Sequence, residues 1–72
     1  MQYYNIGTYI RNRRIKTGKS LNTFAADIDL DSSILSRIEN SKQDIKLQAL
    51  IKIAKGFEQT PAEFLKDFEN KI

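Results

Sequence analysis

Side chains that can form hydrogen bonds gather on one side of a short stretch near the middle of this 72-residue chain. On a 3.6-residue period, that side of residues 32–40 carries Ser32, Ser33, Ser36, Arg37 and Asn40. The opposite side carries Leu35 and Ile38 and can pack against a core. Short hydroxyls let a helix approach base edges, and arginine can reach O6 and N7 of guanine, so the pattern suits the DNA major groove. An ordinary amphipathic surface helix would show the same pattern.

The chain contains no cysteine and no histidine. Disulfides, the usual zinc ligands and imidazole acid-base chemistry are therefore excluded, and its serines have no base to activate them. We expect no enzymatic activity and no cofactor. No apolar run approaches the ~20 residues that span a bilayer, and the first residues do not resemble a signal peptide, so we expect a cytoplasmic protein without a membrane partner.

Residues 27–31 alternate aspartate with apolar residues, as a calcium loop does. A calcium loop needs glycine at its sixth position and glutamate at its twelfth, where this chain has Ser32 and Ile38. We therefore expect no metal site here and interpret the aspartates as capping or solvated groups.

The formal net charge of +3 is unevenly distributed. Residues 1–26 contain only basic charges, whereas residues 57–72 are mainly acidic. This asymmetry favours a polyanion partner on one side and a different partner on the other, although a solvated basic helix face would give the same distribution.

Apolar periodicity and capping residues divide the chain into short helices. Asp31 is placed to cap the helix over residues 32–40, and Thr60, Pro61 and Glu63 form the clearest helix start. The helices are expected over about 6–16, 20–28, 32–40, 47–56 and from 61 onward. With no competing strand pattern, the sequence predicts a single all-α domain over residues 1–72, a compact five-helix bundle with its core at about 6–68.

Two of these helices, joined by a tight turn with Ala25 inside the first, form a helix-turn-helix. With them, several motifs occur in an order that resembles the Cro and phage-repressor type of regulators, the xenobiotic-response-element family with a lambda-repressor-like fold. These motifs are Ile6-Gly7, Ile10-Arg11, Arg14, Ser20-Leu21, Phe24-Ala25, Ile28, residues 35–40, Leu50, Ile53-Ala54 and Phe64-Leu65. The resemblance covers roughly residues 6–66.

The resemblance implies that the helix over 32–40 enters the major groove of operator DNA. Ser32, Ser33, Ser36 and Arg37 would then face bases or nearby phosphates. Ser20, Leu21, Asn40 and Lys42 would contact the DNA backbone, where free N–H groups at a helix start can also bind phosphate. In this family glutamine is frequent at the position of Leu21. Leucine has no side-chain donor, so Leu21 could contact the DNA only through its backbone.

The chain departs from the family pattern at a few positions. Family members commonly have glycine at the positions of Asp29 and Ser41, and aspartate tolerates a left-handed turn better than serine does. Arg13 and Lys19 stand where apolar residues are usual. Either their stems lie along the core with the charges in solvent, or the first helix is rotated.

A buried ion pair is predicted between Arg14 and Glu39. Glu39 lies on the packing side, one turn after Leu35, where an unpaired carboxylate would be costly. Arg14 is the basic partner that the family resemblance supplies.

One recognition helix contacts few base pairs, so we expect a homodimer on two half-sites. Phe64, Phe68 and Ile72 recur at i, i+4 and i+8 and are predicted to form its interface. The alternative is that Phe64 fills the core and Phe68 covers its edge.

These features predict a sequence-specific DNA-binding transcriptional regulator, a repressor or autoregulator. The alternative is a protein-interaction module, for instance an antitoxin whose C-terminal helix holds a toxin. A restriction-modification controller, a phage-type repressor and an autoregulating antitoxin are not separated by the sequence.

Overall fold

The computed structural model describes residues 5–70 of the chain. In this part the elements are α1 (Ile6–Lys16), α2 (Leu21–Asp27), α3 (Ser32–Glu39), α4 (Leu47–Gly56) and α5 (Pro61–Glu69). No strand accompanies them there, so the predicted all-α, five-helix architecture is confirmed. Among the same residues, no helix has the length and apolar character needed to cross a bilayer.

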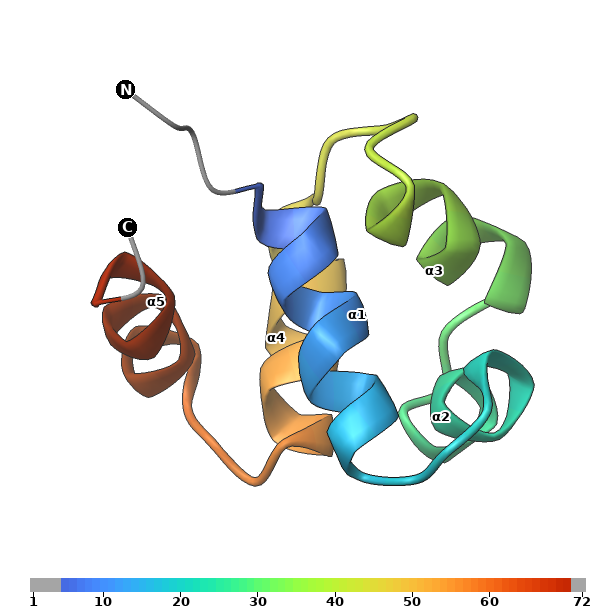
Figure 1. The fold of residues 1–72 in the computed structure, drawn as a ribbon, viewed down its shortest axis with the longest axis horizontal. Coiled ribbons are helices and arrows are strands. Elements are labelled where there is room, and N and C mark those ends of the chain that lie inside the picture. Colours follow the sequence, from blue (N-terminus) through green and yellow to red (C-terminus); the bar gives the residue numbers. More distant parts are fainter. Residues whose placement is uncertain (1–4, 71–72) are drawn as a thin grey trace.

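The helices are arranged around a central crossing of α1 and α4 (Figure 1). α2 and α3 lie on one side of this crossing, and α5 lies on the other. α3 packs against both α1 and α2, while α5 packs against α4. The two helices of the helix-turn-helix therefore sit together at one end of the molecule, away from the C-terminal helix.

Aromatic and branched side chains from all the helices form one core. Its largest fully buried members are Phe24, Phe64, Ile10, Leu35 and Ile53. The ring of Phe57 lies 4.9 Å from that of Phe24 and 5.9 Å from that of Phe64, measured between centroids. This stack joins α2 to α5 through the end of α4, so a short chain without disulfides is closed by apolar packing.

Side-chain caps begin most of the helices, and those at Asp31 and Thr60 are at the predicted residues. Ser20 and Asp31 accept backbone N–H groups at the starts of α2 and α3. Thr60 and Glu63 form a reciprocal capping box, with N–O distances of 2.8 and 3.1 Å. Lys46 precedes α4 without a side-chain cap.

Three helices end in the same way, with a residue of left-handed backbone conformation. Asp29 follows α2 with φ 55°, Ser41 follows α3 with φ 60°, and Glu58 follows α4 with φ 60°. In each case the next residue donates its N–H to a carbonyl five positions back, the pattern of a Schellman motif. Glycine is the residue that adopts this conformation without strain. The family resemblance indicated left-handed turns at Asp29 and Ser41. The left-handed conformation of Glu58 was not predicted from the sequence.

The C-terminal aromatic residues differ from their predicted role. Phe64 is fully buried, so its assignment to a dimer interface is wrong, because the core already uses its entire surface. Phe68 is half-buried, with its ring 5.3 Å from that of Tyr9. Ile72 lies outside the described residues. The i, i+4 repeat thus reflects packing of α5 against α1 and the core.

Candidate nucleic-acid interface

α3 separates a buried side from an exposed side, as its sequence predicts. Leu35, Ile38 and Glu39 are buried against the bundle. The opposite side is formed by Ser33, Arg37 and Asn40, which are exposed, and by Ser32 and Ser36, which are half-buried. The short side chains leave the exposed side narrow, as entry into a groove about 12 Å wide requires.

The start of α3 is organised by Asp31. One of its carboxylate oxygens, Oδ1, accepts the Ser33 N–H at 2.8 Å and the Ser33 hydroxyl at 2.5 Å. The hydroxyl bond, followed by the backbone bonds, holds the pKa of Asp31 below its usual range. With its proton committed to Asp31, the Ser33 hydroxyl presents acceptor lone pairs to any group that approaches α3.

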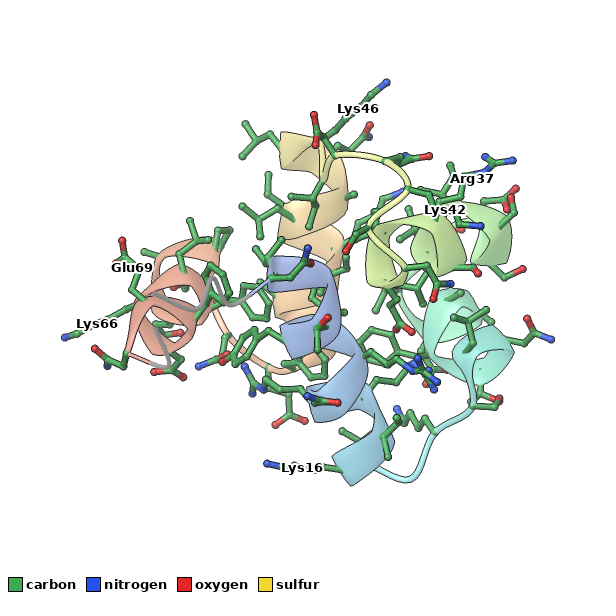
Figure 2. The ribbon with its side chains drawn as sticks, turned by 45° about the horizontal axis from the view of Figure 1, so that its top comes forward. Lys16, Arg37, Lys42, Lys46, Lys66 and Glu69 are labelled. Carbon is green, nitrogen blue, oxygen red and sulfur yellow. The ribbon has the colours of Figure 1, made fainter. Side chains whose placement is uncertain are left out.

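Arg37 extends from α3 into solvent (Figure 2). No hydrogen bond ties down its guanidinium among residues 5–70, so its donors remain available for an external acceptor. Lys42 lies beside α3 and Lys46 extends from the start of α4, whereas Lys66 and Glu69 lie on α5 at the opposite side of the molecule (Figure 2). Exposed cations therefore flank the open side of α3.

The end of α3 fixes the position of Lys42. The Lys42 N–H donates to the carbonyl of Arg37 at 2.8 Å, within the turn formed by Ser41. Asn40 Nδ2 donates to the Ser36 carbonyl at 2.9 Å, which folds its side chain back along α3. The same Nδ2 also donates to the Ser36 hydroxyl oxygen at 3.4 Å. The exposed Lys42 keeps its ammonium donors for a phosphate.

The start of α2 presents backbone groups at the same end of the molecule. Ser20 accepts the Thr23 N–H at 3.1 Å, which caps the helix. The side chain of Leu21 is half-buried and packs against the core. Leu21 can therefore meet a phosphate only through its backbone N–H, in the first turn of α2.

The buried side of α3 is held by the predicted ion pair. Nε and Nη2 of Arg14 donate to the two carboxylate oxygens of Glu39 at 2.8 and 3.0 Å. Nη1 of Arg14 also donates to the Lys19 carbonyl at 2.9 Å. Arg14 is 8% exposed and Glu39 5%, and the hydrogen bonds to Glu39 raise the pKa of Arg14. One guanidinium thus links α1, the α1–α2 loop and the end of α3.

Gly7 allows α1 to touch the same end of α3. A Cβ atom added to Gly7 would lie 2.1 Å from the carbonyl oxygen of Ile38 and 3.2 Å from that of Glu39. The backbones of α1 and α3 thus approach more closely than any side chain would permit. The orientation of α3 depends on this contact as well as on the ion pair.

Two basic residues, Arg13 on α1 and Lys19 in the loop after it, have partners within the protein. The Arg13 guanidinium lies 4.5 Å from the centre of the Phe57 ring and donates to Gln59 Oε1 at 2.7 Å. The half-buried Arg13 side chain thus lies along the core, and its charge is held by a ring face and an amide oxygen. Lys19 forms an exposed ion pair with Asp27 at 2.7 Å. The charge count over residues 1–26 consequently overstated the cations free for a polyanion, and the exposed cations near α3 come from residues 37–46.

Comparisons with known proteins agree with this geometry. The family model described as helix-turn-helix matches residues 10–64. The control protein C.MunI of Mycoplasma sp. is 42% identical over 59 residues, which cover 82% of this chain and 80% of that protein. The solution structure of the DNA-binding domain of the P22 c2 repressor superposes with a TM-score of 0.78 at 23% identity, over 92% of this chain and 87% of that one.

Proposed function

The chain belongs to the helix-turn-helix family of Cro and phage-repressor type and is a DNA-binding transcriptional regulator, and we propose that it controls a promoter by placing α3 in the major groove of an operator. The observation that carries this proposal is the division of α3. Its buried side is clamped by Arg14, while the Arg37 guanidinium on its open side has no hydrogen bond within residues 5–70. Direct readout of base edges requires a helix whose position is fixed and whose exposed side chains have donors free for the bases. α3 meets both conditions through Arg14 and Arg37.

Within this proposal the residues divide into two roles. Arg37 reads a base, most favourably the O6 and N7 acceptors of guanine. Ser32, Ser33 and Ser36 meet bases or adjacent phosphates. Ser20, the backbone of Leu21, Asn40 and Lys42 bind the DNA backbone and set the register of α3.

The regulator acts on its operator as a homodimer. A single α3 covers only a few base pairs, so two copies on half-sites one helical turn apart are needed for useful affinity. We place this activity in the cytoplasm, where bacterial-type operators are found. No catalytic step or cofactor is part of the proposal, and occupancy of the operator then follows the concentration of the protein itself.

The likeness to C.MunI bears on the kind of regulator. That relative is named as a control protein, so of the three kinds left open by the sequence we favour a restriction-modification controller over a phage-type repressor or an antitoxin. The alternative of a protein-interaction module remains open because α4 and α5 carry exposed apolar side chains. Genes adjacent to the coding sequence separate these kinds directly.

The proposal is tested by selecting duplexes from a random pool and titrating the protein against the selected and unselected DNA at several salt concentrations. Selected DNA is expected to bind about 10³-fold more tightly or better, with log affinity falling linearly with log salt for both pools. Lys66→Ala, on α5 away from α3, serves as a control that leaves both curves unchanged. Equal affinity for selected and random duplexes would reject sequence-specific regulation.

A further inference from the structure

The start of α3 carries an exposed carboxylate that none of the DNA contacts proposed above uses. Asp31 lies directly before the helix and is exposed, as is Ser33 two residues later. Its Oδ1 accepts both the N–H and the hydroxyl of Ser33. An ionised carboxylate has about four acceptor sites on its two oxygens, so these bonds leave part of its capacity free. An anion with free acceptor sites therefore stands beside the helix that meets DNA.

The contact with Asp31 turns the Ser33 hydroxyl into an acceptor. Ser33 Oγ lies 2.5 Å from Asp31 Oδ1, and an ionised carboxylate has no proton to donate. The hydroxyl proton therefore lies in this bond, and only lone pairs remain on Oγ for an approaching group. Because the bonds from Ser33 lower the pKa of Asp31, the carboxylate is ionised at neutral pH. The side chains of Asp31 and Ser33 thus present acceptors and no donor.

Arg37 has the opposite character on the same side of α3. It lies one helical turn after Ser33, and its guanidinium carries only donors. After the Ser33 bonds, the charge of Arg37 also contributes to the lowered pKa of Asp31, so the two groups are within electrostatic reach. The open side of α3 therefore changes from acceptors at its start to donors one turn later.

The base edges of the major groove differ in how they meet two neighbouring acceptors. Cytosine presents the N4 amine and no acceptor, whereas adenine presents the N6 amine beside the acceptor N7. Guanine and thymine present the acceptors O6 and O4, which a carboxylate repels, as it repels phosphate oxygens. Two neighbouring acceptors therefore fit cytosine best and adenine second, and they disfavour guanine and thymine.

From this arrangement we infer that Asp31 and Ser33 together select a cytosine in the operator, near the guanine that Arg37 reads. The inference rests on the proposed function, because it requires α3 to lie in the major groove. Ser33 and Arg37 are separated by about 6 Å along the helix axis. In zinc fingers, helix residues three or four positions apart contact successive bases. The selected cytosine therefore lies one or two base pairs from the guanine, and Asp31 both orients the Ser33 hydroxyl and supplies the second acceptor.

Three variants separate the groups involved. Asp31→Asn keeps a capping side chain but removes the charge and replaces one oxygen by an amide donor. Because asparagine pairs with N6 and N7 of adenine, this variant should move the preference from cytosine toward adenine. Ser33→Ala removes one acceptor and should weaken the cytosine preference without favouring adenine. Glu69→Gln is the matched control, since it removes the same charge from an exposed position on α5, at the opposite side of the molecule (Figure 2).

Each protein is titrated against the selected operator and a set of duplexes that carry every base at each position of the half-site. Loss of discrimination in Arg37→Ala locates the guanine. Within two base pairs of it, the natural protein should prefer cytosine to guanine or thymine by about tenfold or more. Asp31→Asn should lower the ratio of cytosine to adenine affinity by about tenfold, and Glu69→Gln should leave it unchanged. Asp31→Asn should also bind random DNA more tightly than Glu69→Gln does, because it removes a negative charge close to phosphates.

The proposed function and the cytosine contact fail in different ways. If the guanine is read but the four bases bind equally well at the pairs around it, the inference is overturned and the proposed function stands. A cytosine preference that survives both Asp31→Asn and Ser33→Ala also overturns it, because another residue then reads the base. If Asp31→Asn destabilises the fold, Ser33→Ala, which keeps the capping residue, decides. If the natural protein prefers no duplex at all, the proposed function fails and the inference fails with it.

Discussion

The two sides of α3 differ in how their side chains are held. Glu39, on the buried side, accepts two hydrogen bonds from Arg14, and Ile38 lies against Gly7 of α1. The guanidinium of Arg37, on the open side, has no hydrogen bond within residues 5–70. The buried side of α3 thus fixes where the helix lies, and its open side is left free to contact DNA. Substitutions on the two sides should therefore change different measured quantities.

The largest expected effect is on the buried side. Arg14→Ala leaves the Glu39 carboxylate buried without its partner and should lower the free energy of unfolding by about 3–5 kcal/mol, measured by urea denaturation. Asp27→Asn breaks the exposed Lys19–Asp27 pair and should lower it by no more than about 1 kcal/mol. Equal losses from the two variants would show that burial does not distinguish the pairs.

On the open side, Arg37→Ala should leave unfolding unchanged and alter DNA binding. We expect it to reduce discrimination at one base pair by about 1–3 kcal/mol, measured with a set of single-substitution operators. Lys42→Ala should weaken binding to all sequences alike and reduce the salt slope by about 1. If Lys42→Ala changed sequence preference while Arg37→Ala did not, the assigned roles would be reversed.

A smaller effect is expected where α3 ends. Ser41 has φ 60°, so Ser41→Gly should relieve backbone strain and raise the free energy of unfolding by about 0.5–1 kcal/mol, after the entropy cost of glycine. Asp29→Gly should give a smaller gain, because aspartate tolerates this conformation better. Neither substitution should change base preference. A loss of stability from Ser41→Gly would mean that the serine side chain itself holds the turn.

The smallest effect concerns the start of α3 and depends on pH. The Ser33 bonds lower the pKa of Asp31 below its ordinary 3.8, so the folded chain binds this proton less readily than the unfolded chain. The resulting stabilisation is fully present above about pH 4 and is lost as pH falls through the lower folded value. Asp31→Asn caps a helix but has no charge. Its difference in thermal midpoint from the natural chain should shrink between pH 7 and pH 2, and a constant difference would contradict the assignment.

The sequence predicted the helices well because their boundaries are local. Ser20, Asp31 and Thr60 each accept an N–H two or three residues ahead, so the information lies within a few positions. The division of α3 into a buried side and an exposed side was predicted for the same reason. The 3.6-residue period of a helix alone places Leu35 and Arg37 on different sides.

The errors concern partners that are distant in the chain. Arg13 meets Gln59 and Phe57, more than forty residues away, so its sequence neighbours did not indicate where its charge lies. Phe64 has the spacing of an interface residue, but periodicity does not distinguish a partner protein from the protein's own core. Glu58 adopts a left-handed conformation in a position without glycine, where no local pattern marks the turn.

Gly7 has a consequence for genetics. A Cβ atom there would lie 2.1 Å from the Ile38 carbonyl oxygen, so every substitution must displace the end of α3. A random screen for loss of regulation should therefore recover Gly7 alleles beside Arg37 alleles, although glycine has no side chain to read DNA. The two classes would be told apart by suppressors: changes that restore the fit between α1 and α3 should rescue the first class, and only compensating changes in the operator should rescue the second.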